Sequence, residues 1–326
     1  MVGASPDDGI RDDHARASRL KTWHTWSLEC LKVCYDSPMI RPLSFRTAFA
    51  IAASALLTVA LLSVVIAQVE MPTTPASSLG QRQGWTLTFQ DEFSGPYGTA
   101  VDPTKWGFDQ GGNGWGNEEL QYYTNTRHNA MTDGSGRLMI RARVEPEDPV
   151  YTSARLNTRG IFTQAYGRFE ARLRVPAGQG LWPAFWLLGT NLGEVGWPSA
   201  GEIDIMEAIG REPTLAHGTI HGPGFSGANA IGASVSLPDN APFADGFHTF
   251  AIEWQENEIR WYLDDVLFQT RGPKDLPGGT RWVFDHPMFM ILNLAVGGQW
   301  PGRPDAKTVF PANLLVDYVR VYRQNP

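Results

Sequence analysis

Cysteine is almost absent from this chain of 326 residues. Its two cysteines, Cys30 and Cys34, both precede a long apolar run at 47–67. A domain that follows this run therefore has no disulfide and no cysteine metal site, and the C-x-x-x-C spacing carries no functional prediction. The stability of such a domain must come from burial of apolar surface, with a bound cation as a further source.

Blocks of positive charge are also absent. The 27 Lys and Arg residues are outnumbered by 34 Asp and Glu residues, which gives a formal net charge of -7. Proteins that bind nucleic acid need clustered cations to neutralise phosphates, so this composition excludes nucleic acid as a partner and leaves an uncharged substrate open. With 34 Gly, 23 Pro and 12 Trp, the chain has the composition of a packed globule rich in loops.

The apolar run at 47–67 has the length of a membrane anchor, but its surroundings favour a signal peptide. Basic residues precede the run, and a small-residue site, Val65-Ile66-Ala67, ends it, which is typical of a signal peptide over 39–67. Because 1–38 would be an unusually long leader, we expect Met39 to be the true start and 1–38 to be a non-native extension. The protein is then secreted, with no stable membrane association after cleavage. Anchoring through 47–67 is the alternative.

Beyond residue 67 a short polar segment precedes the folded part. Residues 68–84 are rich in Pro, Ser and Thr and lack an apolar period, which indicates a linker. From 85 to 326 the chain shows short apolar-alternating runs separated by Gly, Pro, Asn and Asp, without a long helical pattern. The runs span 85–93, 137–144, 167–175, 183–189, 202–210, 248–254, 258–270, 288–298 and 314–323. Many strands at this spacing predict one antiparallel all-β domain, a sandwich or a barrel.

Two of the runs show which face they bury. In GRFEARLRV, apolar side chains alternate with Arg and Glu, so we expect one buried face and one face in water. In LWPAFWLLG, Leu181, Phe185 and Leu187 share one face, whereas Trp182 and Trp186 share the other. A strand with an aromatic face opposite its core face is suited to the wall of a groove.

The run GEIDIMEAIG holds three acids. In a regular strand, Glu202 and Asp204 lie on one face, whereas Glu207 is out of phase by one residue. A helix with the acids outside is the alternative, but the flanking glycines leave only eight residues, which is short for a helix. A β-bulge near Ile205 or Met206 would return Glu207 to the face of the other two acids.

Three carboxyl groups on one face repel one another unless their protonation states differ, and glycoside hydrolysis uses such a difference. Acids at nearby positions of one strand can bring their carboxyl groups to about 5–5.5 Å, the separation in retaining enzymes, whereas inverting enzymes need roughly 6.5–9.5 Å. We therefore expect a retaining mechanism. One Glu would attack the anomeric carbon, and the other would serve as acid and then as base.

The acidic run and its surroundings resemble glycoside hydrolase family 16. The likeness continues through YGRFEARLRVPAGQGLWPAFWLLG, GNEELQYYT, GTIHGPG, HTFAIEW, MILNLAVGGQWPG and VDYVRVY, and covers nearly all of 85–323. The extra residue before the last Glu resembles the laminarinase branch, which hydrolyses β-1,3-glucan, whereas lichenases and xyloglucan enzymes usually have E-x-D-x-E. The resemblance implies a concanavalin A-like jelly-roll of two curved antiparallel sheets with its cleft on the concave face. It also implies Glu202 as nucleophile, Asp204 as its assistant and Glu207 as acid/base.

The resemblance further implies a set of side chains that bind β-glucan. These are Trp182, Trp186, His221, Asn117, Glu119, Trp115, Asn293 and Trp300. The tryptophans would stack on glucose rings, whose C–H faces suit aromatic platforms. His221 could instead be a purely structural histidine, and the loop around Asn117 could be a plain glycine-rich turn with Trp115 exposed.

Glu92 and Asp317 match the family's structural calcium site, although each alone would be read as a solvated acid at a strand end. We expect this structural Ca²⁺, no cofactor for catalysis, a β-glucan polysaccharide as partner and a monomer. The alternatives are a mixed-linkage β-1,3-1,4-glucanase, a galactan hydrolase, a transglycosylase and a non-catalytic β-glucan-binding protein. Retention of all three acids speaks against the last, and the lack of clustered cations in the cleft runs weakens a charged galactan.

Overall fold

The computed structural model describes residues 80–147 and 150–326 of the chain. The predicted extension, the signal peptide with its cleavage site and most of the linker lie outside these ranges. Within them, no helix combines the length and the apolar character that crossing a membrane requires.

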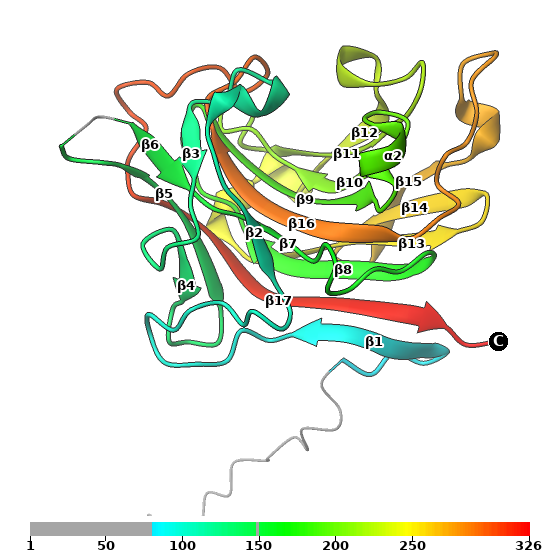
Figure 1. Cartoon of the computed structure of the whole chain (residues 1–326), viewed down its shortest axis with the longest axis horizontal. Helices are drawn as coiled ribbons and strands as arrows, with labels where there is room; N and C mark the ends of the chain where they lie inside the picture. Colours follow the sequence, from blue (N-terminus) through cyan, green and yellow to red (C-terminus); the bar gives the residue numbers. More distant parts are fainter. Residues whose placement is uncertain (1–79, 148–149) are drawn as a thin grey trace, which may run out of the picture. The chain divides into compact units, whose positions relative to one another are not determined.

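The described residues form two stacked β-sheets, as Figure 1 shows. Ten strands make the first sheet: β1 (Trp85–Asp91), β3 (Gln121–Tyr123), β4 (Ala130–Thr132), β5 (Leu138–Val144), β6 (Tyr151–Ser153), β8 (Gly167–Arg174), β13 (His248–Gln255), β14 (Glu258–Leu263), β15 (Val266–Arg271) and β17 (Ala312–Gln324). Seven make the second: β2 (Gly107–Asp109), β7 (Arg155–Asn157), β9 (Leu181–Gly189), β10 (Glu202–Glu207), β11 (Leu215–His221), β12 (Ile231–Ser236) and β16 (Met288–Val296). All pairings are antiparallel except that of β3 with β6.

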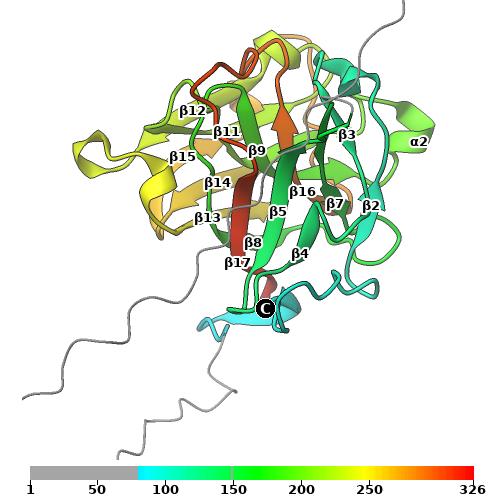
Figure 2. The same cartoon turned by 90° about the vertical axis from the view of Figure 1, so that its left-hand side faces the viewer.

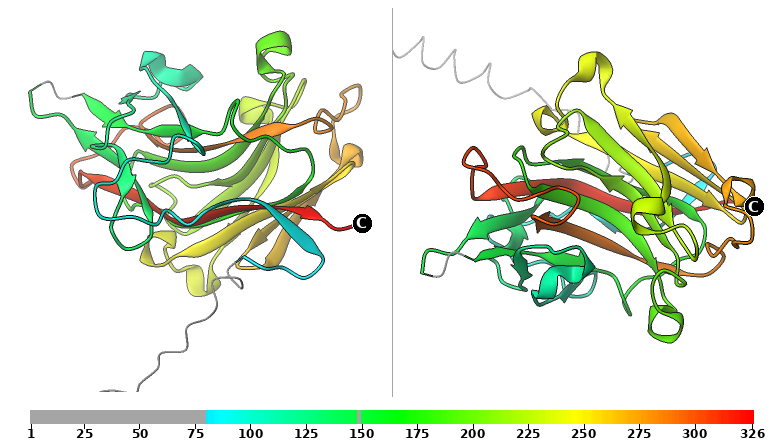
Figure 3. Two further views of the ribbon diagram at one scale, coloured as in Figure 1. Left: turned by 60° about the horizontal axis from the view of Figure 1, so that its bottom comes forward. Right: turned by 90° about the horizontal axis from the view of Figure 1, so that it is seen from above.

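Helical segments in the described ranges are short and lie in the connections. They are η2 (Asn113–Gly116), α2 (Leu192–Val195), η3 (Gly227–Asn229), η4 (Pro238–Asn240), η5 (Phe243–Asp245) and η6 (Pro273–Asp275). The predicted all-β sandwich is therefore confirmed, and Figures 2 and 3 show its two layers from other sides.

The core lies between the two sheets, because each central strand turns its apolar face inward. The first sheet contributes Phe169, Ala171 and Leu173 of β8, and the second contributes Phe185 and Leu187 of β9; all are buried. This alternation matches the faces expected from the sequence, and it leaves the other side of β9 as part of the outer face of the seven-stranded sheet.

The polar face of β8 differs from its prediction. Arg168 is fully buried and Glu170 is 5% exposed, although alternation placed both in water. The Arg168 guanidinium donates to Glu170 at 2.8 Å and to Asp265 at 2.7 Å, and it lies over the Tyr262 ring at 5.2 Å. The ion pairs and the covering hairpin, rather than water, satisfy these charges.

That covering hairpin comes from 258–270, which the alternation predicts as one run. The structure divides it into β14 and β15, joined at Asp264 and Asp265, whose φ angles are 49° and 63°. Aspartate tolerates this left-handed conformation, which a two-residue hairpin turn requires.

Candidate active site

The acidic run forms β10, an interior strand of the seven-stranded sheet between β9 and β11, and it contains the expected bulge. Its register against β9 shifts between Asp204 and Met206, and its register against β11 shifts between Asp204 and Glu207. Ile203, Ile205 and Met206 are all buried in the core. The extra residue therefore lets consecutive apolar side chains enter the core while Glu207 turns back to the outer face.

The cross-strand partners form three rows across the outer face. Glu202 lies opposite His221, Asp204 opposite Thr219 and Glu207 opposite His217 on β11. On the other side, Asp204 lies opposite Trp186 and Glu207 opposite Ala184 of β9. The three acids thus lie on one face beside an aromatic side chain, as expected, and beside the hydroxyl of Thr219, which was not expected.

The bulge is held from the core side by Trp261 of β14. The Trp261 indole N–H donates to the main-chain carbonyl of Asp204 at 2.8 Å. A Cβ at Gly218 of β11 would lie only 2.5 Å from the Trp261 ring, so glycine is required there for the two sheets to approach. The position of the acids therefore depends on a contact between sheets.

Thr219 links Asp204 to Glu207 by hydrogen bonds, and His221 lies between Asp204 and Glu202. The Thr219 hydroxyl donates to Asp204 at 2.6 Å and lies 3.3 Å from Glu207. His221 Nε2 lies 3.1 Å from Asp204 and 3.7 Å from Glu202. Asp204 is 3% exposed, so the central carboxylate is stabilised by these donors and not by water.

The two glutamates each have their own indole donor. Trp182 Nε1 donates to Glu207 at 3.0 Å, and Trp197 Nε1 donates to Glu202 at 3.1 Å. Trp182 was predicted as a stacking platform, and the structure shows that its indole N–H is also placed to hold Glu207. Trp197 comes from the loop that precedes β10.

Burial, followed by the negative charge of Asp204, raises the pKa of both Glu202 and Glu207 well above the usual value for a glutamate. The protonation of one glutamate affects that of the other, because both interact with the negative charge of Asp204. At neutral pH the cluster therefore holds a proton that isolated glutamates would lose, which is the condition for one of them to act as an acid.

The pKa of His221 is set by opposing effects. Burial alone would lower it, but the hydrogen bond to Asp204 and the surrounding carboxylates raise it to about 9. The Gly227 main-chain N–H donates to Nδ1 at 3.1 Å, which favours the neutral imidazole. The raised pKa favours a cationic His221 at neutral pH, with Nε2 facing Asp204.

The predicted aromatic residues line the same face. The Trp182 and Trp300 rings meet edge to face with centroids 5.4 Å apart, and His217 lies 5.0 Å from Trp300. Trp186 is half-buried, and its indole N–H donates to Asn293 at 2.8 Å. These side chains extend the surface on both sides of the acids.

Asn293 and Glu119 are engaged mainly within the protein. The Asn293 amide nitrogen donates to the Tyr123 hydroxyl at 3.1 Å, and that hydroxyl lies 3.3 Å from Glu119. Gln121 donates to Glu119 at 2.6 Å, and Asn117 donates to it at 3.2 Å. Only Asn117 is exposed, so Asn117 is the member of this network that is freest to meet a ligand.

The loop that carries Trp115 is more than a plain turn. Trp115 is half-buried, not exposed as expected, and lies 4.8 Å from the Arg155 guanidinium. Arg155 also lies 4.7 Å from the Trp186 ring and pairs with Asp109 at 3.0 Å. Asn113 and Trp115 in this loop have left-handed φ angles. The sequence pattern does not predict these conformations.

Five residues of the site were missed from the sequence. They are Tyr123, Arg155, Trp197, His217 and Thr219. Thr219 and His217 could have been found, because they alternate with His221 on one strand face. The others come from loops or short strands whose placement depends on tertiary contacts.

Metal ligation was expected at Glu92 and Asp317, and the structure gives each carboxylate an arginine. Arg320 donates to both oxygens of Glu92 at 2.8 and 2.9 Å, and Arg172 donates to Asp317 at 2.6 Å. As placed, the Glu92 side chain does not fit a calcium ligand, whereas one oxygen of Asp317 has no hydrogen bond. The calcium stays a prediction.

Within the described ranges, Glu202, Asp204 and His221 bring potential metal-binding atoms within 4.8 Å of one another. The same three side chains make the close contacts of the acid cluster, and we interpret the group as an acid–base cluster.

Comparisons with known proteins agree with this geometry. The sequence profile described as "Glycosyl hydrolases family 16" matches residues 116–320. A β-glucanase of Rhodothermus marinus is 46% identical over 253 residues, which cover 73% of this chain and 85% of that protein.

Several solved structures are also similar to this chain. The laminarinase catalytic domain of Thermotoga maritima matches with a TM-score of 0.69 at 45% identity and covers 75% of this chain and 100% of its own. An endo-β-1,3-glucanase of Pyrococcus furiosus matches with a TM-score of 0.67 at 46% identity and covers 73% of this chain and 94% of its own.

Proposed function

The chain belongs to glycosyl hydrolase family 16, and on that premise we propose that it is a retaining endo-β-1,3-glucanase that acts on laminarin-type polysaccharide. The observation that carries the proposal is the bulged strand β10, which brings Glu202, Asp204 and Glu207 to one face beside Trp182 and Trp186. The laminarinase and endo-β-1,3-glucanase structures that resemble this chain support β-1,3-glucan as the substrate.

In the first step Glu202 attacks the anomeric carbon of the bound glucan, and the glycosidic C–O bond breaks. Its carboxylate must be ionised, and His221 at 3.7 Å supplies the nearest positive charge. In the described ranges, no basic side chain lies within 4 Å of Glu207. This asymmetry favours ionised Glu202 as nucleophile and protonated Glu207 as the acid that protonates the leaving oxygen.

In the second step a water molecule hydrolyses the glycosyl–Glu202 ester. Glu207, now ionised, removes a proton from this water, and the C–O bond to Glu202 breaks, which restores both carboxyl groups. Asp204 stays between them as a positioning residue, since its hydrogen bonds to Thr219 and His221 hold the cluster together. The configuration at the anomeric carbon is retained.

The test measures reducing-sugar release from laminarin, lichenan, cellulose and agarose by the wild-type protein and by Glu202→Ser and Glu207→Gln. We expect laminarin to be the best substrate and both variants to lose at least about a thousandfold in kcat, since each removes a reacting group. Proton NMR should show the β-anomer as the first product.

Other outcomes would redirect the proposal. Lichenan as the preferred substrate would indicate a mixed-linkage enzyme, and agarose would indicate a galactan hydrolase. Binding of laminarin without release of sugar by the wild-type protein would indicate a β-glucan-binding protein. Full activity in either glutamate variant would contradict the assignment of Glu202 and Glu207.

We further propose that the protein is exported by a signal peptide cleaved after Ala67 and that the mature protein is a monomer. The small-residue site at the end of the apolar run supports the cleavage. N-terminal sequencing of secreted protein should begin near Gln68, and light scattering should give a monomer mass. A membrane-retained product that still contains 47–67 would contradict the proposal.

We also propose that a structural Ca²⁺ binds near Asp317. Its support is the resemblance to the family site and the free oxygen of the Asp317 carboxylate. EDTA should lower the melting temperature, and elemental analysis should find about one calcium per chain. An unchanged melting temperature together with no bound calcium would contradict it.

A further inference from the structure

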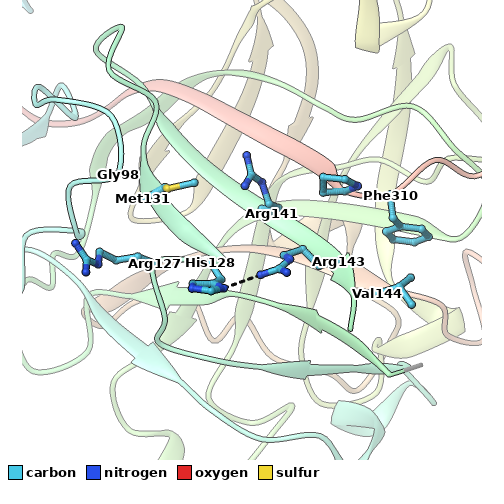
Figure 4. A pocket seen from close by; sticks show the side chains of 9 residues that line it. Gly98, Arg127, His128, Met131, Arg141, Arg143, Val144 and Phe310 are labelled. Carbon is cyan, nitrogen blue, oxygen red and sulfur yellow. Dashed lines mark hydrogen bonds between the residues drawn. The ribbon is translucent and has the colours of Figure 1, made fainter. Parts of the chain in front are cut away.

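A hollow of about 670 Å³ lies on the ten-stranded sheet, away from the catalytic acids of the seven-stranded sheet. We call it the outer hollow, and Figure 4 shows it from close by. Its lining residues are Gly98, Arg127, His128, Met131, Arg141, Arg143, Val144, Phe310 and Pro311. Nothing in the proposed hydrolysis uses it.

Positive charge dominates this lining. Arg141 and Arg143 alternate on β5, so both project from the same face of the sheet, and Arg127 lies beside them. Arg143 donates to Nδ1 of His128 at 2.8 Å and lies 3.8 Å from Glu145. No carboxylate in the described ranges lies within 4 Å of Arg127 or Arg141.

The arginine surface continues beyond the hollow. Met131, in the wall of the hollow, also belongs to a small apolar cluster with Met139 and Leu315, against which Phe247 packs. Three more arginines surround the Phe247 ring at 5.0 to 5.6 Å; they are Arg137, Arg172 and Arg174. Of these, Arg174 has no carboxylate partner within 4 Å in the described ranges.

Such a concentration of guanidinium groups is unusual in a chain with a net charge of -7. Guanidinium groups recognise carboxylates and sulfates through paired hydrogen bonds. A neutral glucan carries neither group, so the outer hollow is unsuited to the substrate proposed for the acids. Its apolar wall at Phe310 and Val144 offers a surface for the C–H faces of sugar rings.

The size of the hollow is suited to a saccharide. Its volume lies within the range of about 300–1,000 Å³ typical of ligand sites, so it can accommodate a few sugar residues. We propose that the outer hollow binds a short segment of acidic polysaccharide through its carboxylate or sulfate-ester groups.

The test is calorimetric titration of the full-length chain at low ionic strength with four hexamers, namely a uronic acid, a sulfated glucan, neutral laminarihexaose and the oligonucleotide dT6. Saturating neutral oligosaccharide is present in a parallel series to fill the cleft. Both acidic saccharides should bind at least about tenfold more tightly than dT6, and neutral sugar should not displace them. The ratio of the two acidic affinities distinguishes carboxylate from sulfate.

The variant Arg127→Gln/Arg143→Gln removes two cations while it leaves Arg141 on Asn313 at 3.0 Å. It should weaken binding of acidic saccharides about tenfold or more and leave hydrolysis of laminarin unchanged. The matched control Arg281→Gln/Arg323→Gln, at two exposed positions, removes the same charge elsewhere and should bind as wild type. Circular dichroism and the melting temperature establish that both variants fold.

Three results would overturn the proposal. They are no binding of either acidic saccharide, equal weakening in the two double variants, and displacement by neutral oligosaccharide. Tighter binding of dT6 would also overturn it and assign the hollow to single-stranded nucleic acid. Because binding is measured without turnover, each result is independent of whether the protein hydrolyses laminarin.

Discussion

Single side chains at the acids take part in more than one contact, and this limits what can be predicted for each of them. Alternation along β9 correctly placed Trp182 and Trp186 on the face of the acids. Their hydrogen bonds could not be predicted from alternation along one strand, because the partner of Trp182 is Glu207 on another strand. Trp197 was missed altogether, since its loop must first fold against β10 before its N–H reaches Glu202.

The first prediction for a single residue concerns His221. Its positive charge lowers the pKa of Glu202, so removing it in His221→Gln should raise that pKa further. The nucleophile must be ionised, and the acidic limb of the profile of kcat/KM against pH should therefore move to higher pH. We expect kcat at pH 6 to fall more than at pH 8, with a smaller change in KM.

The control is His248→Gln, at a histidine that pairs with Asp264 on the other sheet. The profile of kcat/KM against pH for this variant should match that of the wild-type protein. An acidic limb that does not move in His221→Gln would mean that His221 is neutral, as its hydrogen bond from Gly227 favours, and only orients Asp204.

Among the elements, β10 decides where the acids lie. Most of the long strands could be predicted, because their apolar residues alternate and their ends carry Gly, Pro, Asn or Asp. However, β11 and β12 were not among the predicted runs, and β14 and β15 fall within one predicted run. The bulge could be located because one extra residue in the strand is needed to bring all three acids to the same face. The short strands β2, β3, β4, β6 and β7 could not be predicted, since three residues hold no period. The β14–β15 turn was missed because the apolar residues on both sides of Asp264 and Asp265 continue one alternating pattern.

The bulge predicts how the site responds when one residue is removed from β10. Deleting Met206 should leave a regular strand in which Glu202, Asp204 and Glu207 alternate, so Glu207 keeps its place opposite Ala184. We expect this variant to fold, to lose about 2–5 kcal/mol of unfolding free energy with the buried Met side chain, and to keep measurable hydrolysis. Urea unfolding and laminarin assays measure the two effects.

The matched variant inserts one alanine between Met206 and Glu207. A second extra residue should turn the Glu207 carboxyl away from Asp204 and reduce hydrolysis to the level of Glu207→Gln. Wild-type activity in the insertion variant would show that the bulge does not set the position of Glu207.

For the whole molecule, the stability of the ten-stranded sheet involves buried charges as well as the apolar core. Without disulfides beyond residue 67, the sandwich depends on its core and on buried pairs such as Arg168 with Glu170. These residues were expected in water, because alternation shows which side a residue takes and not what later covers that side. The β14–β15 hairpin covers them through Tyr262 and Asp265.

Arg168→Met should therefore destabilise the protein by about 3–5 kcal/mol, because it leaves Glu170 buried without its partner. Adding Glu170→Gln should restore part of this loss. The control Arg211→Met breaks an exposed pair with Glu212 and should cost about 0–1 kcal/mol. Chemical unfolding measures all three, and equal losses in Arg168→Met and Arg211→Met would contradict the role of burial.

The pairing of β1 with β17 has a consequence for how this domain can be joined to others. Trp85 lies opposite Gln324, so the chain enters and leaves the sandwich side by side, on the ten-stranded sheet and not on the sheet that carries the acids. Adjacent ends of this kind suit a domain for insertion into a loop of another protein or for tandem fusion. Modules attached at either end would start from the same place and leave the acids accessible to a long polymer.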